Sequence, residues 1–152
     1  MHRNRIFYWI GVLTDGKLYY GAEGEVLKVF NVKDGTAIKA LMSEGVKFGV
    51  VSGRGSAALL RRAEELGLDF CQMNISDKAE AVAALREQYG VAVHETLFVG
   101  DDTNDCVVRS ECGHLYAVND AAQALLEICD VQLKTKGGAG VFKEVLKRIH
   151  GN

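Results

Sequence analysis

The feature that most constrains the fold of this sequence is a regular alternation of short β-forming runs with helical patterns. Apolar runs rich in β-branched or aromatic residues lie at 6–10, 46–51, 96–99, 115–118 and 131–133. Helical patterns separate them, and three of these end at a glycine suited to a C-cap: Gly45, Gly67 and Gly90. A further apolar stripe predicts a last helix that ends near Ile149. The alternation predicts an α/β fold, a doubly wound, Rossmann-like parallel sheet flanked by helices.

Size and charge narrow the classes of protein. A chain of 152 residues with 48% hydrophobic content fits one domain over 1–152. Its net charge of −2 gives no long-range positive field, so neither nucleic acid nor a membrane surface is an expected partner. The apolar runs are too short to cross a membrane and no secretory signal precedes the first, which predicts a cytoplasmic protein. The four cysteines match no zinc or redox spacing and are expected to be reduced and mostly buried.

A hairpin is predicted near the start of the chain. Residues 17–20 and 25–30 are apolar runs on either side of Gly21-Ala22-Glu23-Gly24, which predicts a β-hairpin flap over about 17–30. We expect it to project over the ligand crevice. Its two apolar faces cannot both be covered by its own domain, so we expect a homo-oligomer, most simply a tetramer, with the hairpin near the interface.

Candidate binding residues follow the predicted strands, where doubly wound sheets place their ligand crevice. Ser52 and Gly53 open the turn after the second core strand and are candidates for a phosphate cradle, although small residues in such turns are often purely structural. Further on, Ser76 is a candidate helix cap, and Lys78 could reach a phosphate oxygen or remain solvated.

The most informative cluster is acidic. Asp101, Asp102 and Asp105 follow the buried run at 96–99. Packed carboxylates repel each other unless a cation or a helix N-terminus offsets their charge, so this cluster predicts a metal site.

These motifs, in this order, resemble those of the haloacid dehalogenase phosphatases. The stretches 11–16 (Gly-Val-Leu-Thr-Asp-Gly), 30–35 (Phe-Asn-Val-Lys-Asp-Gly) and 137–140 (Gly-Gly-Ala-Gly) are similar to the branch that hydrolyses 3-deoxy-D-manno-octulosonate 8-phosphate and to relatives acting on nine-carbon keto-sugar phosphates. The resemblance covers nearly the whole chain. It implies a small hairpin in place of a large cap domain, and a Mg²⁺-dependent site that binds a sugar phosphate.

The first motif departs from this family. In that branch the first strand ends in Asp-x-Asp-Gly, and alignment on Gly11 puts Tyr8 at the nucleophile position and Ile10 at the general acid/base position. A phenol ionises only near pH ~10, and an isoleucine carries no proton. In that family the first Asp also ligates magnesium, so the resemblance implies that Asp101 and Asp102, with Asp105 in support, would hold the ion with one fewer charge, and Mg²⁺ binding is expected to be weak. Asp15 is the nearest other carboxylate, but it lies on the loop that leads into the hairpin.

Two functions therefore stay open. The loss of both aspartates favours a catalytically degenerate homologue that binds a phosphosugar in a regulatory or assembly role. The replacement of the branch's tail arginine by Ala139 also puts substrate binding in doubt. Retention of the later motifs favours an active Mg²⁺-dependent phosphatase for 3-deoxy-D-manno-octulosonate 8-phosphate or a related keto-sugar phosphate.

Overall fold

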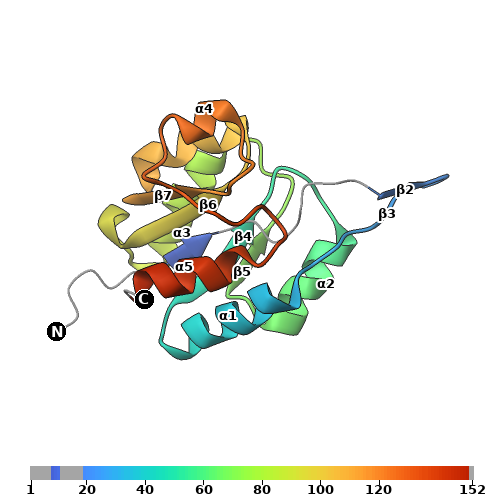
Figure 1. The fold of residues 1–152 in the computed structure, drawn as a ribbon, viewed down its shortest axis with the longest axis horizontal. Coiled ribbons are helices and arrows are strands. Elements are labelled where there is room, and N and C mark those ends of the chain that lie inside the picture. Colours follow the sequence, from blue (N-terminus) through green and yellow to red (C-terminus); the bar gives the residue numbers. More distant parts are fainter. Residues whose placement is uncertain (1–7, 11–18, 151–152) are drawn as a thin grey trace.

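The protein is described by a computed structural model that covers residues 8–10 and 19–150 (Figure 1). Its main sheet has six strands in the order β5-β4-β1-β6-β7-β8, and each adjacent pair is parallel. The strands are β1 (Tyr8–Ile10), β4 (Lys47–Val51), β5 (Phe70–Gln72), β6 (Thr96–Gly100), β7 (His114–Ala117) and β8 (Val131–Gln132). The strand order reverses between β1 and β6, so the predicted doubly wound α/β fold is confirmed.

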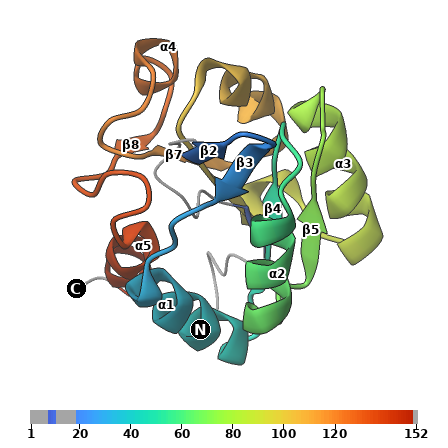
Figure 2. The same ribbon diagram turned by 90° about the vertical axis from the view of Figure 1, so that its right-hand side faces the viewer.

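Helices cover both faces of this sheet. They are α1 (Val32–Ser43), α2 (Ala57–Leu66), α3 (Lys78–Tyr89), α4 (Gln123–Leu126) and α5 (Val141–Ile149), with 3-10 helices η1 (Val93–Glu95) and η2 (Thr103–Glu111). Helix α1 packs on α5 and α2, while α3 and α4 pack on η2. Figures 1 and 2 show α1, α2 and α5 together on one side of the sheet. This arrangement of a parallel sheet between two layers of helices agrees with the prediction.

The predicted glycine signals end three helices. Gly67 and Gly90 adopt left-handed φ values of 68° and 66° as C-caps of α2 and α3. Gly45, at φ 92°, lies one residue beyond Glu44, the C-cap of α1. A residue without Cβ adopts these angles at little cost, which is why the helices end there.

The hairpin is present but shorter than predicted. Strands β2 (Tyr19–Gly21) and β3 (Gly24–Leu27) pair antiparallel in a separate two-stranded sheet. Residues 17 and 18 lie outside the described residues, and the residues after Leu27 leave the strand early. Figure 1 shows the hairpin standing out from the body instead of folding over it. The hydroxyl of Tyr20 accepts a hydrogen bond from Arg54 Nη2 at 3.3 Å, which links the hairpin to the turn after β4.

The core forms between the two helical layers and the sheet. Phe48 of β4 and Phe142 of α5 are fully buried and meet edge to face at 4.9 Å between ring centroids. The four cysteines are free; Cys112 is buried, and Cys71, Cys106 and Cys129 are partly buried against the core, in agreement with the expectation that they are mostly buried. Within the described residues, no helix is long and apolar enough to cross a bilayer.

Candidate functional site

The strand register brings the predicted site residues to one edge of the sheet. Ile10 of β1 is paired with Gly49 of β4 on one side and with Phe98 of β6 on the other. The chain then continues beyond these partners to Ser52 and Asp101, at the carboxyl ends of β4 and β6. The two segments therefore flank the end of β1 at the point where the strand order reverses, the usual ligand crevice of such sheets.

An ion pair between Lys78 and Asp105 lies at the centre of this edge. Lys78 Nζ is 2.6 Å from Asp105 Oδ1, and both side chains are almost completely buried. The other oxygen, Asp105 Oδ2, accepts hydrogen bonds from the backbone N–H groups of Asp101 at 2.9 Å and Asp102 at 3.1 Å. Asp105 thus fixes the loop after β6 and points Lys78 toward it. A Cβ at Gly100 would lie 2.9 Å from the Asp105 side chain, so this position needs glycine.

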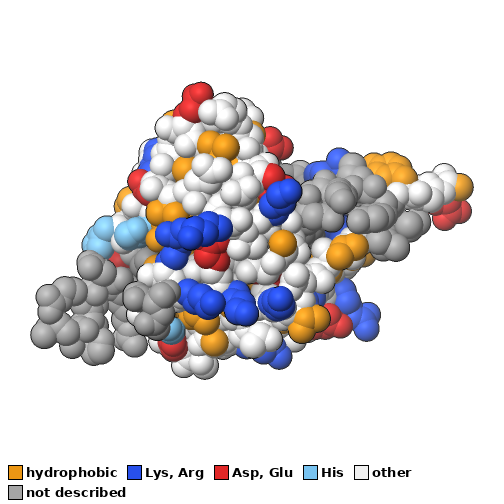
Figure 3. Space-filling view, viewed as in Figure 1, with side chains coloured by type: hydrophobic (Ala, Val, Ile, Leu, Met, Phe, Trp, Pro, Cys, Tyr) orange, Lys and Arg blue, Asp and Glu red, His pale blue; other side chains and the backbone are white. Residues whose placement is uncertain are grey.

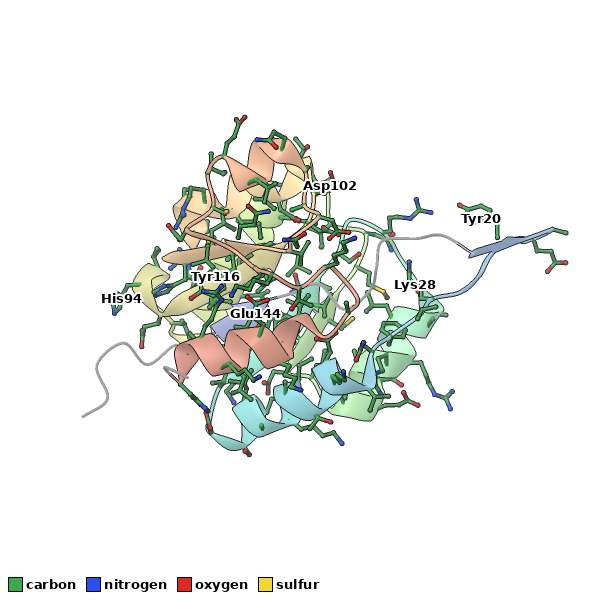
Figure 4. The ribbon with its side chains drawn as sticks, viewed as in Figure 1. Tyr20, Lys28, His94, Asp102, Tyr116 and Glu144 are labelled. Atoms are coloured by element: carbon green, nitrogen blue, oxygen red, sulfur yellow. The ribbon has the colours of Figure 1, made fainter. Side chains whose placement is uncertain are left out.

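The ionised form of the Asp101 carboxyl is destabilised by its surroundings. Burial, and next the negative charge of neighbouring Asp105, raise its pKa from 3.8 to about 6. Asp102 is exposed, and its carboxylate accepts from the backbone N–H of Thr103 at 2.6 Å at the start of η2. Figure 4 shows Asp102 on the side of the body from which the hairpin with Tyr20 projects.

The three aspartates do not converge as a ready set of ligands. In the part of the chain that the structure describes, no group of three or more His, Cys, Asp or Glu side chains is arranged to hold a metal ion. Asp105 is occupied by Lys78 and by two backbone amides. Among the described residues, Asp101 and Asp102 are therefore the carboxylates of this cluster left to meet a cation.

The turn after β4 has the open backbone that the sequence suggested. Ser52 Oγ accepts from the Arg54 N–H at 3.2 Å and donates to the Arg54 carbonyl at 3.0 Å. Gly53 is exposed, and a Cβ built there would stay 3.6 Å from Asn104 Nδ2. The turn thus lies against the loop after β6, where Ser52 and Gly53 can face one ligand.

Two details around α3 differ from expectation. The N-cap of this helix is Asp77, whose side chain accepts from the Glu80 N–H at 3.2 Å, so the prediction of Ser76 as the cap was wrong. Lys78 is not a solvated first-turn lysine, because its ammonium is held by Asp105 and lies 3.5 Å from Asn104 Oδ1.

Asn104 is a residue that the sequence did not single out. Its carboxamide oxygen lies near Lys78 Nζ, and its nitrogen approaches Gly53 across the crevice. Asn104 therefore lies between the lysine and the turn after β4. A polar side chain inside an acidic loop motif was the only available signal, and it does not identify the partner.

Tyr8 and Ile10, the two positions that depart from the resemblance, are in the central strand β1. Their backbone register is defined, while their side chains lie outside what the structure describes. The positions agree with the expected place of the missing carboxylates, at the end of β1 between β4 and β6.

The comparison with family profiles decides the family. A haloacid dehalogenase-like hydrolase profile matches residues 11–108, more than half of the chain, and a second of the same description matches residues 73–145. The chain belongs to the haloacid dehalogenase-like hydrolase family. The first match begins immediately after Ile10, at Gly11.

Within the haloacid dehalogenase-like hydrolases, the chain is most informatively compared with one branch. It is 41% identical over 139 residues to 3-deoxy-D-manno-octulosonate 8-phosphate phosphatase KdsC of Haemophilus influenzae, covering 91% of this chain and 77% of the relative. The enzyme of the same name from Yersinia pestis is 35% identical, covering 91% and 74%. The predicted resemblance is confirmed.

Solved structures agree with this placement. The cobalt-bound deoxy-D-mannose-octulosonate 8-phosphate phosphatase of Haemophilus influenzae superposes with a TM-score of 0.93 at 38% identity, covering 97% of this chain and 89% of that one. The 3-deoxy-D-manno-octulosonate 8-phosphate phosphatase of Moraxella catarrhalis, in complex with magnesium, phosphate and the sugar acid, gives 0.91 at 29% identity, covering 98% and 87%.

Proposed function

We propose that this chain is a Mg²⁺-dependent phosphatase acting on 3-deoxy-D-manno-octulosonate 8-phosphate or a related nine-carbon keto-sugar phosphate. The named relatives favour hydrolysis over the non-catalytic role that the first motif suggested. The observation that carries the proposal is the buried Lys78–Asp105 pair, which organises the loop after β6 at the crevice. A buried ion pair is expensive to maintain for stability alone, so its retention here supports a working phosphate site.

The described residues suit a phosphate dianion. Lys78 has three N–H donors, and Asp105 and Asn104 take two of them, which leaves one for a phosphate oxygen. The turn of Ser52 and Gly53 lies near Asn104, and the Ser52 hydroxyl, which donates to the Arg54 carbonyl in this structure, would turn to a phosphate oxygen on binding.

Two carboxylates fit a hard cation at the same place. Asp101 has a pKa raised to about 6 by burial and by Asp105, so a cation beside it would relieve an unfavourable charge. Asp101 and Asp102 would hold Mg²⁺, which takes one or two carboxylates and completes its shell with water and phosphate. When bound, the ion would neutralise charge that develops on the transferring phosphoryl group.

Tyr8 and Ile10 favour a second candidate, a protein that binds the sugar phosphate without turning it over. The Tyr8 phenol is not ionised at neutral pH and so is no ready nucleophile, and Ile10 carries no proton to donate. The phosphatase therefore needs an attacking group from another position. Asp15, the nearest carboxylate in sequence, lies outside the described residues.

One experiment separates the two candidates. Phosphate release from 3-deoxy-D-manno-octulosonate 8-phosphate is measured with and without Mg²⁺, for the unmodified chain and for Asp101→Ala. Magnesium-dependent turnover on the order of 1 per second or more, abolished by Asp101→Ala, supports the phosphatase. Calorimetric binding of the same compound without turnover supports the second candidate, and absence of both refutes the site.

The affinity of the site for Mg²⁺ can be tested separately from activity. Weak Mg²⁺ binding remains our prediction, and a dissociation constant below about 100 micromolar, measured by calorimetry, would contradict it.

We also propose a homotetramer with the hairpin near the interface, because Tyr20 is 63% exposed and Val29 46% exposed, and isolated two-stranded ribbons are marginal in water. A monomeric mass in light scattering would exclude this assembly.

A further inference from the structure

A cluster of lysines lies along the seam between α1 and α5, away from the aspartates of the candidate site. Lys33 is in the first turn of α1, Lys134 follows β8, and Lys143 and Lys147 are one turn apart on α5. All four line one pocket of about 320 Å³. Figure 3 shows Lys and Arg side chains gathered over α5 and α1 on this face. The net charge of the chain is −2, so this positive surface is a local feature.

The charges of this cluster are not neutralised within the described part of the chain. None of the four ammonium groups has an ion pair or a side-chain hydrogen bond among the described residues. Glu144 is the one carboxylate in the pocket lining. It is already engaged, because it accepts from the Lys134 and Thr135 N–H groups, the Thr135 hydroxyl and Arg148 Nε.

An apolar groove continues from the lysines. A second pocket of about 390 Å³ is lined by Lys33, Lys143 and Lys147 together with Thr36 and the apolar residues Val32, Ala37, Ala40 and Leu146. The three shared lysines make the two pockets one continuous feature, which we name the α1–α5 groove. Val32 is 76% exposed at its mouth, beside the apolar side chains of the groove floor.

The distribution of charge selects the kind of occupant. Lys33 stands on the α1 side of the groove, and Lys143 and Lys147 stand on the α5 side at i and i+4 spacing. An acyl phosphate carries its charge at one end only, so it would not pair with lysines on both sides of the groove. A small inorganic anion would not contact the apolar residues between them. A nucleobase would need aromatic or amide partners, and the described groove lining has none. A helical peptide with carboxylates at i and i+4 beside an apolar stripe matches both the rims and the floor.

We propose that the α1–α5 groove binds an acidic amphipathic helix of a partner protein. The apolar stripe of that helix packs on Val32, Ala40 and Leu146, and its carboxylates pair with the lysines on the two rims. The contact buries Val32 and supplies the missing negative charges. This binding uses no residue of the phosphate site and stands or falls separately from the proposed phosphatase activity.

The test uses the full chain and a synthetic fluorescent peptide of about 16 residues, with Leu at i, i+3, i+4 and i+7 positions and Glu along both edges. Fluorescence anisotropy is expected to give micromolar binding. Lys143→Glu combined with Lys147→Glu should weaken it by about tenfold or more. The matched control Lys39→Glu changes an exposed lysine of α1 outside the groove and should leave the affinity within about twofold.

Two further measurements separate the apolar contribution from charge. A peptide with each Leu replaced by Ser, and Ala40→Trp in the protein, should each weaken binding by about tenfold at unchanged charge. If the serine peptide binds as well as the leucine peptide, or if Lys39→Glu weakens binding as much as the groove variant, the proposal is overturned. It is also overturned if light scattering shows a dimer that the groove variant dissociates, because the occupant is then a second copy of this chain.

Discussion

The buried pair between Lys78 and Asp105 makes a prediction about stability that the geometry sets. The two charges are 2.6 Å apart, with 10% and 2% of their side chains exposed. At an effective dielectric constant of about 20 their attraction is about 6 kcal/mol, most of which offsets the cost of removing both charges from water. The pair therefore adds little net stability, but each partner depends on the other.

We predict that Lys78→Met and Asp105→Asn each lower the free energy of unfolding by about 3–5 kcal/mol, because each leaves one buried charge unpaired. The double variant should cost about as much as one single variant, which gives a coupling energy of about 3–5 kcal/mol. Urea denaturation at pH 7, followed by circular dichroism, measures the free energy of unfolding of the unmodified protein, the two single variants and the double variant, which together form a double-mutant cycle.

A surface pair provides the control. Lys47 and Asp69 are 4.0 Å apart and the lysine side chain is 49% exposed. The cycle with Lys47→Met and Asp69→Asn should give a coupling below about 1 kcal/mol. A Lys78–Asp105 coupling of the same small size would refute the reasoning, because the pair would then behave as a solvent-screened contact.

Three further predictions concern other sites. Burial raises the pKa of Asp34 from 3.8 to about 6, despite N–H donors from Phe142 and Gly140, so the folded state binds the extra proton and stability should fall by about 2 kcal/mol as the pH rises from 4 to 6; Asp34→Asn should flatten this slope in pH-dependent urea titrations. Gly49→Ala should destabilise by about 2 kcal/mol in urea, since its Cβ would overlap the Phe70 ring, and Phe70→Leu in the same chain should recover part of the loss. Tyr8→Asp with Ile10→Asp should give a magnesium-dependent phosphatase rate above that of either single variant, measured after circular dichroism has confirmed folding.

Much of the sheet was predictable because most of its strands carry their own pattern. Thr96 to Gly100 is buried throughout, and such a continuous apolar run signals a central parallel strand. β5 was missed because Phe70-Cys71-Gln72 is short and only Phe70 is buried. Its identity as a strand comes from pairing with β4, which no local pattern contains.

The candidate site was predictable as a set of residues and not as a set of contacts. Lys78 and Asp105 are 27 residues apart, so their pairing depends on where β5 and β6 place the following turns. The N-cap of α3 is Asp77 and not Ser76 for a local reason. Both side chains can cap a helix, and a shift of one residue in the preceding turn decides between them.

The hydrogen bond from the Phe142 N–H to Asp34 Oδ1, at 2.9 Å, joins residues 108 positions apart and has a consequence for synthesis on the ribosome. The first long helix of the chain is covered by the last one, so α1 leaves the exit tunnel long before its cover exists. Until Phe142 emerges, the ring of Phe48 lacks its edge-to-face neighbour and Asp34 has no amide donor from α5. A message cut short before α5 would therefore yield a chain with an open hydrophobic face, which chaperones and proteases recognise in nascent proteins.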